Sequence, residues 1–287
     1  MRVRRFCAFP MNQIETSPSP SVPSKRVPGI AQSIALWALF VGVVTIVTIA
    51  LYLVSRFGGV SLDLSSYAFA QQIIAWPITL GVCLRWSEAS FRDACRLTLF
   101  PVRIVPALFI AFFGLTIFAI ASRSLIPMPE VIQKFIAQVE TEKNQLTFFL
   151  PLVVGAPLGE ELFFRGLVLR GFLGRYSVTK AVLASALFWS LSHLNPWQAV
   201  GALPLGLVLG WLVVRTGSVI PAIIGHMIAN FSPSYLFPPL ALALGGDAEA
   251  INADHFPPTM LAIGGAMAGI GGFVLWRQLA KLSGQSV

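Results

Sequence analysis

The feature that most constrains this chain is a series of long apolar runs that are nearly free of charge. The run from Ser33 to Val54 contains no charged residue at all, and a helix needs about 20 apolar residues to cross the hydrocarbon core of a bilayer. Over the whole chain only 11% of the residues are charged, less than half of the roughly 25% typical of soluble proteins. So few charges cannot cover a water-exposed surface, and the sequence predicts an all-α, polytopic membrane protein.

The apolar runs predict about eight transmembrane helices in one domain, 32–287. The expected spans are 33–54, 67–84, 104–121, 146–173, 178–194, 197–214, 219–231 and 260–280. Pro77 predicts a kink in the second of them. Residues 129–142 carry apolar side chains on one helical face and polar ones on the other, a pattern typical of a helix that lies in the membrane interface. Residues 1–31 are rich in Ser and Pro and predict a disordered cytoplasmic tail.

The basic residues indicate how the chain is oriented in the membrane. The formal charge is +8, but the lysines and arginines stand at the edges of the apolar runs and form no basic stripe of the kind that nucleic-acid proteins have. No nucleic-acid partner is therefore expected. If the N-terminus is cytoplasmic, 16 of the 20 basic residues fall on the cytoplasmic side, as the positive-inside rule requires. Both termini are predicted to be cytoplasmic, and Cys7, Cys83 and Cys95 show no spacing typical of a metal site.

Two adjacent glutamates interrupt the predicted span 146–173. Ionisable groups are costly inside a bilayer, so each needs a reason. On a helix Arg165 lies about 40° from Glu161 but about 140° from Glu160, which favours an ion pair between Glu161 and Arg165 at the i, i+4 spacing. A structural charge cluster would explain Arg165 but not two neighbouring carboxylates. Glu160 is therefore a candidate general base.

Two further predicted spans carry histidines. His193 follows Trp189 by one helical turn, so the indole is expected to pack against the imidazole and fix it. His226 and Asn230 share one face of a short helix at i, i+4. Each group taken alone is also compatible with a polar contact between helices. Counted at 1.5 Å per residue, however, Glu160, His193 and His226 all come near the bilayer midplane, which predicts one polar cavity between the helices of the C-terminal half.

A carboxylate, two imidazoles and a carboxamide in a dry cavity are suited to activating water. Glu160, aided by His193, could take a proton from a water molecule that attacks a peptide carbonyl, while His226 and Asn230 donate hydrogen bonds to the oxyanion. The residues Glu160, His193 and His226 could instead hold Zn²⁺ with an open water position. The helix signature His-Glu-x-x-His is absent, which makes the metal hypothesis the weaker one.

The motifs Glu160-Glu161-x-x-x-Arg165, Trp189-x-x-x-His193 and His226-x-x-x-Asn230 resemble those of the CPBP family. This family, also called Abi, includes the type II CAAX prenyl endopeptidases and bacteriocin-processing or self-immunity proteins, and the resemblance covers about 146–231. The resemblance implies an intramembrane protease that cleaves a peptide or protein delivered to it in the membrane. Prenylated CAAX-type proteins are among the substrates that it implies. The implied roles follow the matching positions: Glu160 is the catalytic carboxylate and His193 its partner.

The resemblance also implies that His226 and Asn230 stabilise the oxyanion, and that Glu161 and Arg165 hold the site together. One position departs from the family pattern. The family usually has Phe four residues before this histidine, where this chain has Trp189. An aromatic side chain is kept at the right spacing, so the departure bears on the shape of the cavity.

Other classes of function use the same residues. In a secondary transporter or proton-coupled channel, Glu160, His193 and His226 would form a proton relay, although the sequence shows no inverted repeat. A non-catalytic immunity or scaffold protein of the same fold is a further alternative. The chain has no Gly-x-Ser-x-Gly elbow and no Gly-rich phosphate loop. Neither the substrate nor a dependence on prenylation follows from the sequence.

Overall fold

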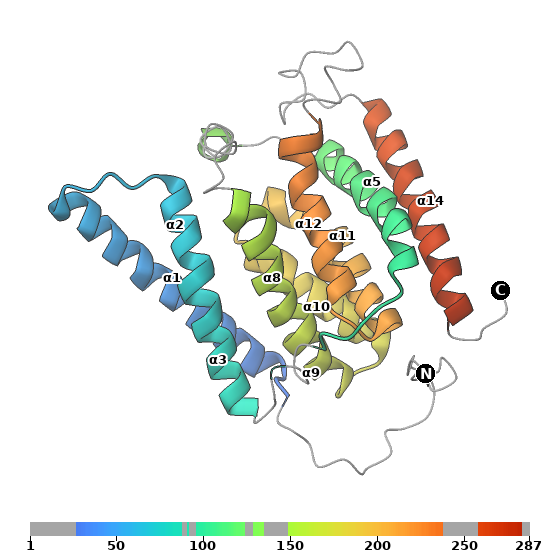
Figure 1. Cartoon of the computed structure of the whole chain (residues 1–287), viewed down its shortest axis with the longest axis horizontal. Coiled ribbons are helices and arrows are strands. Elements are labelled where there is room, and N and C mark those ends of the chain that lie inside the picture. The colour runs from blue at the N-terminus through green and yellow to red at the C-terminus, as the bar shows by residue number, and fades with distance from the viewer. Residues whose placement is uncertain are drawn as a thin grey trace.

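The computed structural model describes residues 27–87, 91, 96–123, 129–134, 149–237 and 258–282. Every regular element in these ranges is a helix, which confirms the all-α prediction. Figure 1 shows α1 to α3 on one side of the molecule, α5 and α14 on the other, and α8 to α12 between them. The helices from α8 to α12 therefore form the centre of the bundle.

The first half of the described chain contains the helices that lie on the two sides of the central bundle, apart from α14. In chain order the elements are α1 (Ile30–Gly58), α2 (Leu64–Ala70), η2 (Gln71–Ala75), α3 (Trp76–Ser87), η3 (Val102–Ile104) and α5 (Val105–Arg123). The helix α1 begins at Ile30, one residue before the predicted end of the N-terminal tail. The rest of that tail, 1–26, lies outside the described residues.

The second half contains the segment with the paired glutamates. One continuous helical rod consists of η4 (Leu150–Gly155), α8 (Ala156–Glu160), η5 (Glu161–Val168) and α9 (Leu169–Leu173). It is followed by α10 (Val178–Ser192), α11 (Pro196–Thr216), α12 (Ile220–Phe231), η6 (Ser232–Leu236) and α14 (Pro258–Leu282).

Proline explains two of the π-helical segments. η2 ends two residues before Pro77 and η4 ends two residues before Pro157. Proline has no backbone N–H, so the carbonyl group four residues earlier loses its usual partner and the helix widens locally. The position at which the sequence predicted a kink is thus the end of a π-helical turn.

Each of the eight predicted spans is helical over most of its described residues, but the helices differ in length. Among the described residues five helices are long and apolar enough to cross a membrane, whereas α10 and α12 are shorter apolar helices. The prediction of an all-α polytopic membrane protein is confirmed, while the number eight stays a prediction. Of the predicted interfacial helix 129–142 only 129–134 is described; it is helical from 130 to 134, with Lys134 paired to Glu130 at 2.7 Å.

The span that contains α5 is the most buried of the five, with 67% of its most apolar stretch buried against 6% for α1 and 17% for α14. Small residues let α14 approach it. A Cβ atom on Gly264 would lie 2.5 Å from the backbone nitrogen of Phe118, whereas Gly265 has only ordinary contacts and Gly269 has open space beside it. The close contact therefore uses Gly264.

Two glycines of α11 also allow a close approach between helices. A Cβ atom on Gly206 would lie 2.9 Å from the Trp189 ring, and one on Gly210 would lie 3.1 Å from Val182. Both glycines are on α11 and both neighbours are on α10. This close approach brings the Trp189 ring against α11, next to the polar groups of the centre.

Candidate active site

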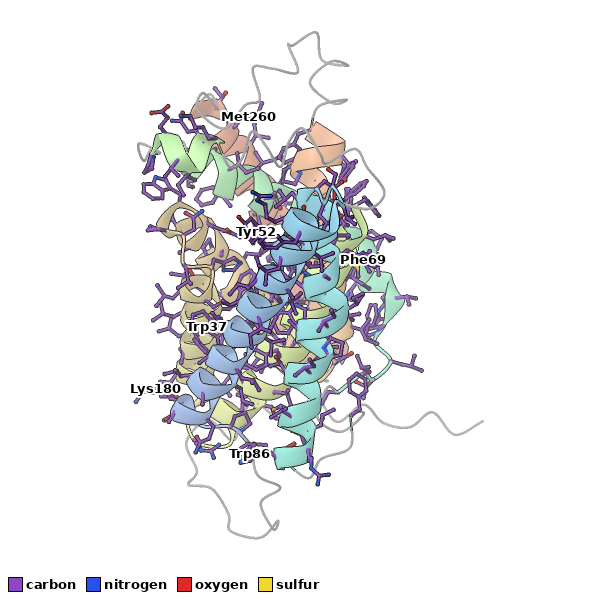
Figure 2. The ribbon with its side chains drawn as sticks, turned by 90° about the vertical axis from the view of Figure 1, so that its left-hand side faces the viewer. Trp37, Tyr52, Phe69, Trp86, Lys180 and Met260 are labelled. Carbon is purple, nitrogen blue, oxygen red and sulfur yellow. The ribbon has the colours of Figure 1, made fainter. Side chains whose placement is uncertain are left out.

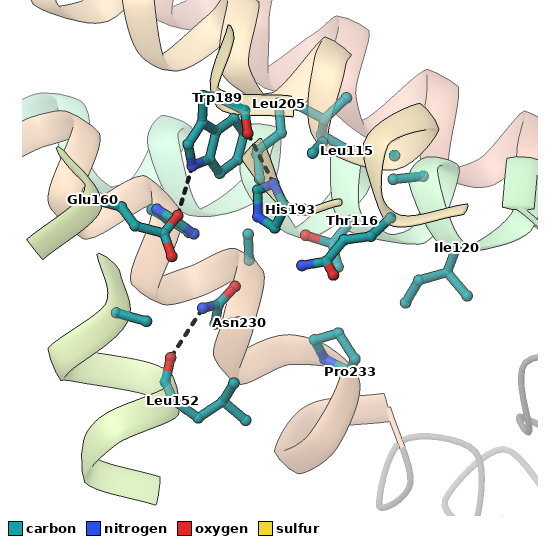
Figure 3. Close-up of a pocket in the computed structure, with 17 residues that line it drawn as sticks. Leu115, Thr116, Ile120, Leu152, Glu160, Trp189, His193, Leu205, Asn230 and Pro233 are labelled. Carbon is teal, nitrogen blue, oxygen red and sulfur yellow. Dashed lines mark hydrogen bonds between the residues drawn. The ribbon is translucent and has the colours of Figure 1, made fainter. Parts of the chain in front are cut away.

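A pocket of about 340 Å³ lies between the central helices and contains all four predicted catalytic side chains. Glu160 is the last residue of α8, His193 directly follows α10, and His226 and Asn230 lie on α12. Figure 3 shows Glu160, His193 and Asn230 at the pocket. These residues are up to 70 positions apart in the sequence. The structure therefore brings together the groups that the depth argument placed in one cavity.

The predicted ion pair between Glu161 and Arg165 is present. Arg165 Nη1 donates to Glu161 Oε1 at 2.9 Å, and both side chains are completely buried. His226 reaches the same oxygen with Nδ1, also at 2.9 Å, a contact that sequence spacing did not predict. We call Glu161, Arg165 and His226 the buried polar cluster. A buried charge without a partner is strongly destabilising, so each member of this cluster depends on the others.

Trp189 connects the buried polar cluster to the pocket. Its indole N–H donates to Glu160 Oε2 at 2.6 Å, and the Arg165 guanidinium lies over its ring at 4.4 Å. The imidazoles of His193 and His226 contact the same ring edge to face, with ring centres 5.1 and 5.2 Å away. The sequence predicted only the contact with His193. The central place of this tryptophan arises from contacts between helices.

His193 is held in one tautomer by its own helix. Its Nδ1 lies 2.9 Å from the carbonyl oxygen of Trp189 and 3.2 Å from that of Ser190. Carbonyl oxygens only accept hydrogen bonds, so Nδ1 carries the proton and Nε2 is left as the acceptor. The imidazole can therefore take a proton on Nε2, as a partner of a general base must.

The turn after His193 joins α10 to α11. Leu194 adopts a left-handed conformation with φ of 54°, which is uncommon for a residue with a bulky side chain. Asn195 then caps α11, and its Oδ1 accepts from the backbone N–H groups of Trp197 and Gln198 at 3.1 and 3.4 Å. The sequence marked this turn through Asn195-Pro196, but not its backbone conformation.

His226 and Asn230 are both partly engaged. Asn230 Nδ2 donates to the carbonyl oxygen of Leu152 at 2.9 Å (Figure 3), which leaves its second N–H for another acceptor. A carboxylate accepts from His226 Nδ1–H, so the neutral ring has only a lone pair on Nε2. His226 can donate from Nε2 only when the His226 and Glu161 pair holds one additional proton, a requirement that spacing alone did not reveal.

The residues Glu160, His193 and His226 do not form the alternative zinc site in this structure, since within the described ranges no group of three or more His, Cys, Asp or Glu is arranged to hold a metal ion. His193 Nδ1 contacts carbonyl oxygens and His226 Nδ1 contacts Glu161. Zinc-bound histidines make the same contacts with the ring nitrogen that does not bind the metal, so these contacts are compatible with either chemistry. We derive the chemistry of the site from the side chains themselves.

The remaining wall of the pocket is mostly small or apolar. It includes Leu115, Leu152, Ala156, Ala202 and Leu205. Two more polar side chains line the pocket, Thr116 on α5 and Gln198 at the start of α11, and the sequence singled out neither. The Thr116 hydroxyl donates to the carbonyl oxygen of Phe112 on its own helix. Gln198 follows the helix-capping Asn195 by three residues, and this spacing was the one sequence signal that pointed to it.

The comparison with protein families agrees with these motifs. A family model described as type II CAAX prenyl endopeptidase Rce1-like matches residues 142–232, a segment that contains every residue of the buried polar cluster and the four predicted catalytic residues. Neither the curated proteins nor the solved structures contain a match to the chain. Over residues 142–232 the chain is therefore similar to the Rce1-like type II CAAX prenyl endopeptidases, in agreement with the resemblance of its motifs to the CPBP family.

Proposed function

We propose that this protein is an intramembrane endopeptidase in which Glu160 and His193 activate water. The family match supports a CAAX-type membrane protease, and one observation carries the assignment of residues. Glu160, His193, His226 and Asn230 come from three helices and line one pocket within an otherwise apolar bundle. Such a pocket can hold water and a peptide bond away from bulk solvent.

In the proposed reaction a water molecule attacks the carbonyl carbon of the peptide bond. The Glu160 carboxylate takes one proton of that water, and His193 Nε2 is the second proton acceptor beside it. The new C–O bond forms as the carbonyl π bond breaks, which gives a tetrahedral oxyanion. The proton then passes to the leaving nitrogen and the C–N bond breaks, so that a carboxyl group and an amine are released.

The oxyanion is stabilised by Asn230 and His226. Asn230 offers its second amide N–H, and His226 offers Nε2–H when its pair with Glu161 holds one additional proton. A single donor of this kind contributes about 10²- to 10³-fold to the rate of acyl transfer. Glu161 and Arg165 position His226, and Trp189 positions Glu160 through the 2.6 Å hydrogen bond.

The substrate is a peptide or protein that reaches the pocket from the membrane. The wall carries apolar side chains, and the lining residues include no lysine or arginine. Both observations favour an apolar segment near the scissile bond. A prenylated C-terminal tail of the CAAX type is one such substrate, and an apolar segment without a lipid is another.

The proposal is tested by reconstituting the full chain in liposomes and measuring cleavage of prenylated and unprenylated peptides by mass spectrometry. We expect cleavage by the wild type and strong loss in Glu160→Gln and His193→Ala. Full activity of Glu160→Gln would refute the mechanism. Loss of activity on chelation would show that a metal takes part, contrary to the donor geometry.

The same liposomes distinguish the two other classes of function. Proton or solute flux without peptide cleavage would identify a transporter or channel that uses Glu160, His193 and His226 as a relay. Neither flux nor cleavage, with the protein folded, would identify a non-catalytic immunity or scaffold protein.

A further inference from the structure

Along the helix axes, the pocket lies in one half of the bundle and not in the other. On α5 it is lined by residues from Leu115 onward, in the second half of that helix, and on α11 by residues up to Leu205, in the first half. On α12 its lining begins at His226 and continues to Pro233 in η6. Since these helices alternate in direction, all of these residues lie toward the same end of the bundle.

The side chains become more exposed toward that end. On α10, Trp189 is buried and His193 is half-buried; on α12, His226 is buried and Asn230 is half-buried. On α11, Gly201 and Ala202 are buried, whereas Gln198 is exposed. The buried polar cluster thus closes the floor of the pocket, and its mouth lies at Gln198.

Most of the basic residues lie at the opposite end. Lys180 and Trp86 are at one end of the molecule and Met260 is at the other (Figure 2). Of the thirteen lysines and arginines among the described residues, nine stand at the helix ends near Lys180: Arg85, Arg96, Arg103, Arg170, Arg175, Lys180, Arg215, Arg277 and Lys281. Arg165 belongs to the buried polar cluster, and Arg56, Arg123 and Lys134 are the exceptions. Contacts join several of these ends, since Arg175 donates to the carbonyl oxygen of Val27, before α1, and Val219 N–H donates to that of Arg96.

We propose that the pocket opens on the side of the membrane opposite the cytoplasm. The positive-inside rule assigns the basic end to the cytoplasm, and the mouth at Gln198 lies at the other end. Given the proposed endopeptidase function, the substrate is then a peptide segment that stands on the outer side, such as the outer end of a membrane-spanning segment or an exported tail. A prenylated tail on the cytoplasmic side would have to cross the bilayer to reach this mouth.

The proposal is tested by labelling single cysteines with a membrane-impermeant maleimide. The background is the full chain with Cys7, Cys83 and Cys95 replaced by serine. Gln198→Cys marks the mouth and Lys180→Cys is the matched control at the basic end, where the side chain is exposed. Labelling is compared in spheroplasts of an expressing bacterium and in sealed inside-out vesicles from the same cells.

We expect Gln198→Cys to react at least tenfold more in spheroplasts, and Lys180→Cys to react at least tenfold more in inside-out vesicles. Reaction of both cysteines from the same side would overturn the proposal. So would a Gln198→Cys that reacts from neither side, because the mouth would then not be open to water.

A second measurement separates this proposal from the proposed function. A membrane-impermeant fluorogenic peptide is added to both preparations of the wild type. Cleavage only from the outer side supports both proposals. Cleavage only in inside-out vesicles would retain the protease and reject the outward mouth, whereas outward labelling without any cleavage would retain the mouth and reject the protease.

Discussion

Glu160 and Glu161 are neighbours in the sequence but belong to two different regions. Glu161 lies in the buried polar cluster, where one oxygen is shared by Arg165 and His226 and the side chain is completely buried. Glu160 lies in the pocket, is half-buried and accepts from the indole of Trp189. Two residues of identical chemistry thus have different surroundings because helical rotation turns them to different sides of one rod.

The different surroundings of the two glutamates indicate which substitutions should affect folding and which should affect catalysis. A buried ion pair that loses one partner leaves an uncompensated charge, so the cluster is sensitive to any change of charge. A half-buried carboxylate beside a pocket is not enclosed in this way, so a change of its charge should cost less in folding. Changes in the cluster should therefore affect folding, and changes in the pocket should affect activity.

The largest effect is expected for Glu160→Gln. Removing a general base typically lowers the rate by about 10²- to 10⁴-fold, while the amide keeps the size of the side chain and can still accept from Trp189. The free energy of unfolding should change by no more than about 0.5 kcal/mol. Peptide cleavage in liposomes and unfolding in detergent mixed with increasing SDS measure the two quantities.

Glu130→Gln is the matched control for that substitution. Glu130 is exposed, and its pair with Lys134 lies on the surface, where such pairs contribute little. The same chemical change there should leave both activity and stability unaltered. If Glu160→Gln unfolds the protein, the division between the two regions is wrong.

Arg165→Met should have the converse effect and lower the stability. It leaves the buried Glu161 carboxylate with His226 alone, and breaking a buried pair in this way costs about 3–5 kcal/mol. The free energy of unfolding in the SDS titration should fall by that amount, and less protein should accumulate in the membrane.

A double variant sharpens this prediction. Glu161→Gln together with Arg165→Met removes both charges, so the double variant should be more stable than Arg165→Met alone. Equal stability of the two variants would show that the charge of Glu161 is not what the guanidinium compensates.

Trp189→Phe tests the connection between the two regions. Phenylalanine keeps an aromatic ring for Arg165 and the imidazoles, and it is the residue that the family usually has, but it cannot donate to Glu160. A hydrogen bond to a charged group contributes about 1.5–3 kcal/mol. We therefore expect kcat to fall by about 10- to 100-fold, with KM nearly unchanged.

Trp276→Phe on α14 is the control, since this side chain is exposed and far along the chain from the pocket. It should behave as the wild type. An unchanged kcat in Trp189→Phe would mean that the indole N–H does not position the carboxylate.

The smallest effect is expected for Gln198→Ala at the mouth of the pocket. The side chain is exposed, and substitutions at such positions usually change the free energy of unfolding by less than about 0.5 kcal/mol. A loss of several kcal/mol in the SDS titration would show that Gln198 is part of the packed interior, and the mouth would have to lie elsewhere.

The sequence predicted the contacts that are local. The i, i+4 spacing was enough for the pair of Glu161 with Arg165 and for the packing of Trp189 on His193, because helix geometry fixes both. The helical segments could also be predicted, because the hydropathy of the sequence determines where an apolar helix is required.

The contacts between helices could not be predicted in this way. His226 is 65 residues from Glu161, and Trp189 is 29 residues from Glu160. Whether these side chains meet depends on how α10 and α12 rotate about their axes, and no spacing within one helix contains that information. The additional proton that His226 needs as a donor followed only from its contact with Glu161.

The π-helical segment η5 determines how the two glutamates are aligned with the rest of the rod. A π-helical turn accommodates more residues than an α-helical one, and each residue of an α-helix corresponds to about 100° of rotation. If the residues Glu161–Val168 were α-helical instead, the part that carries Glu160 would be turned relative to α9 by about that angle for each additional residue that the π-helical turns now hold. The direction of Glu160 toward Trp189 therefore depends on the π-helical conformation of η5 as well as on the number of residues in it.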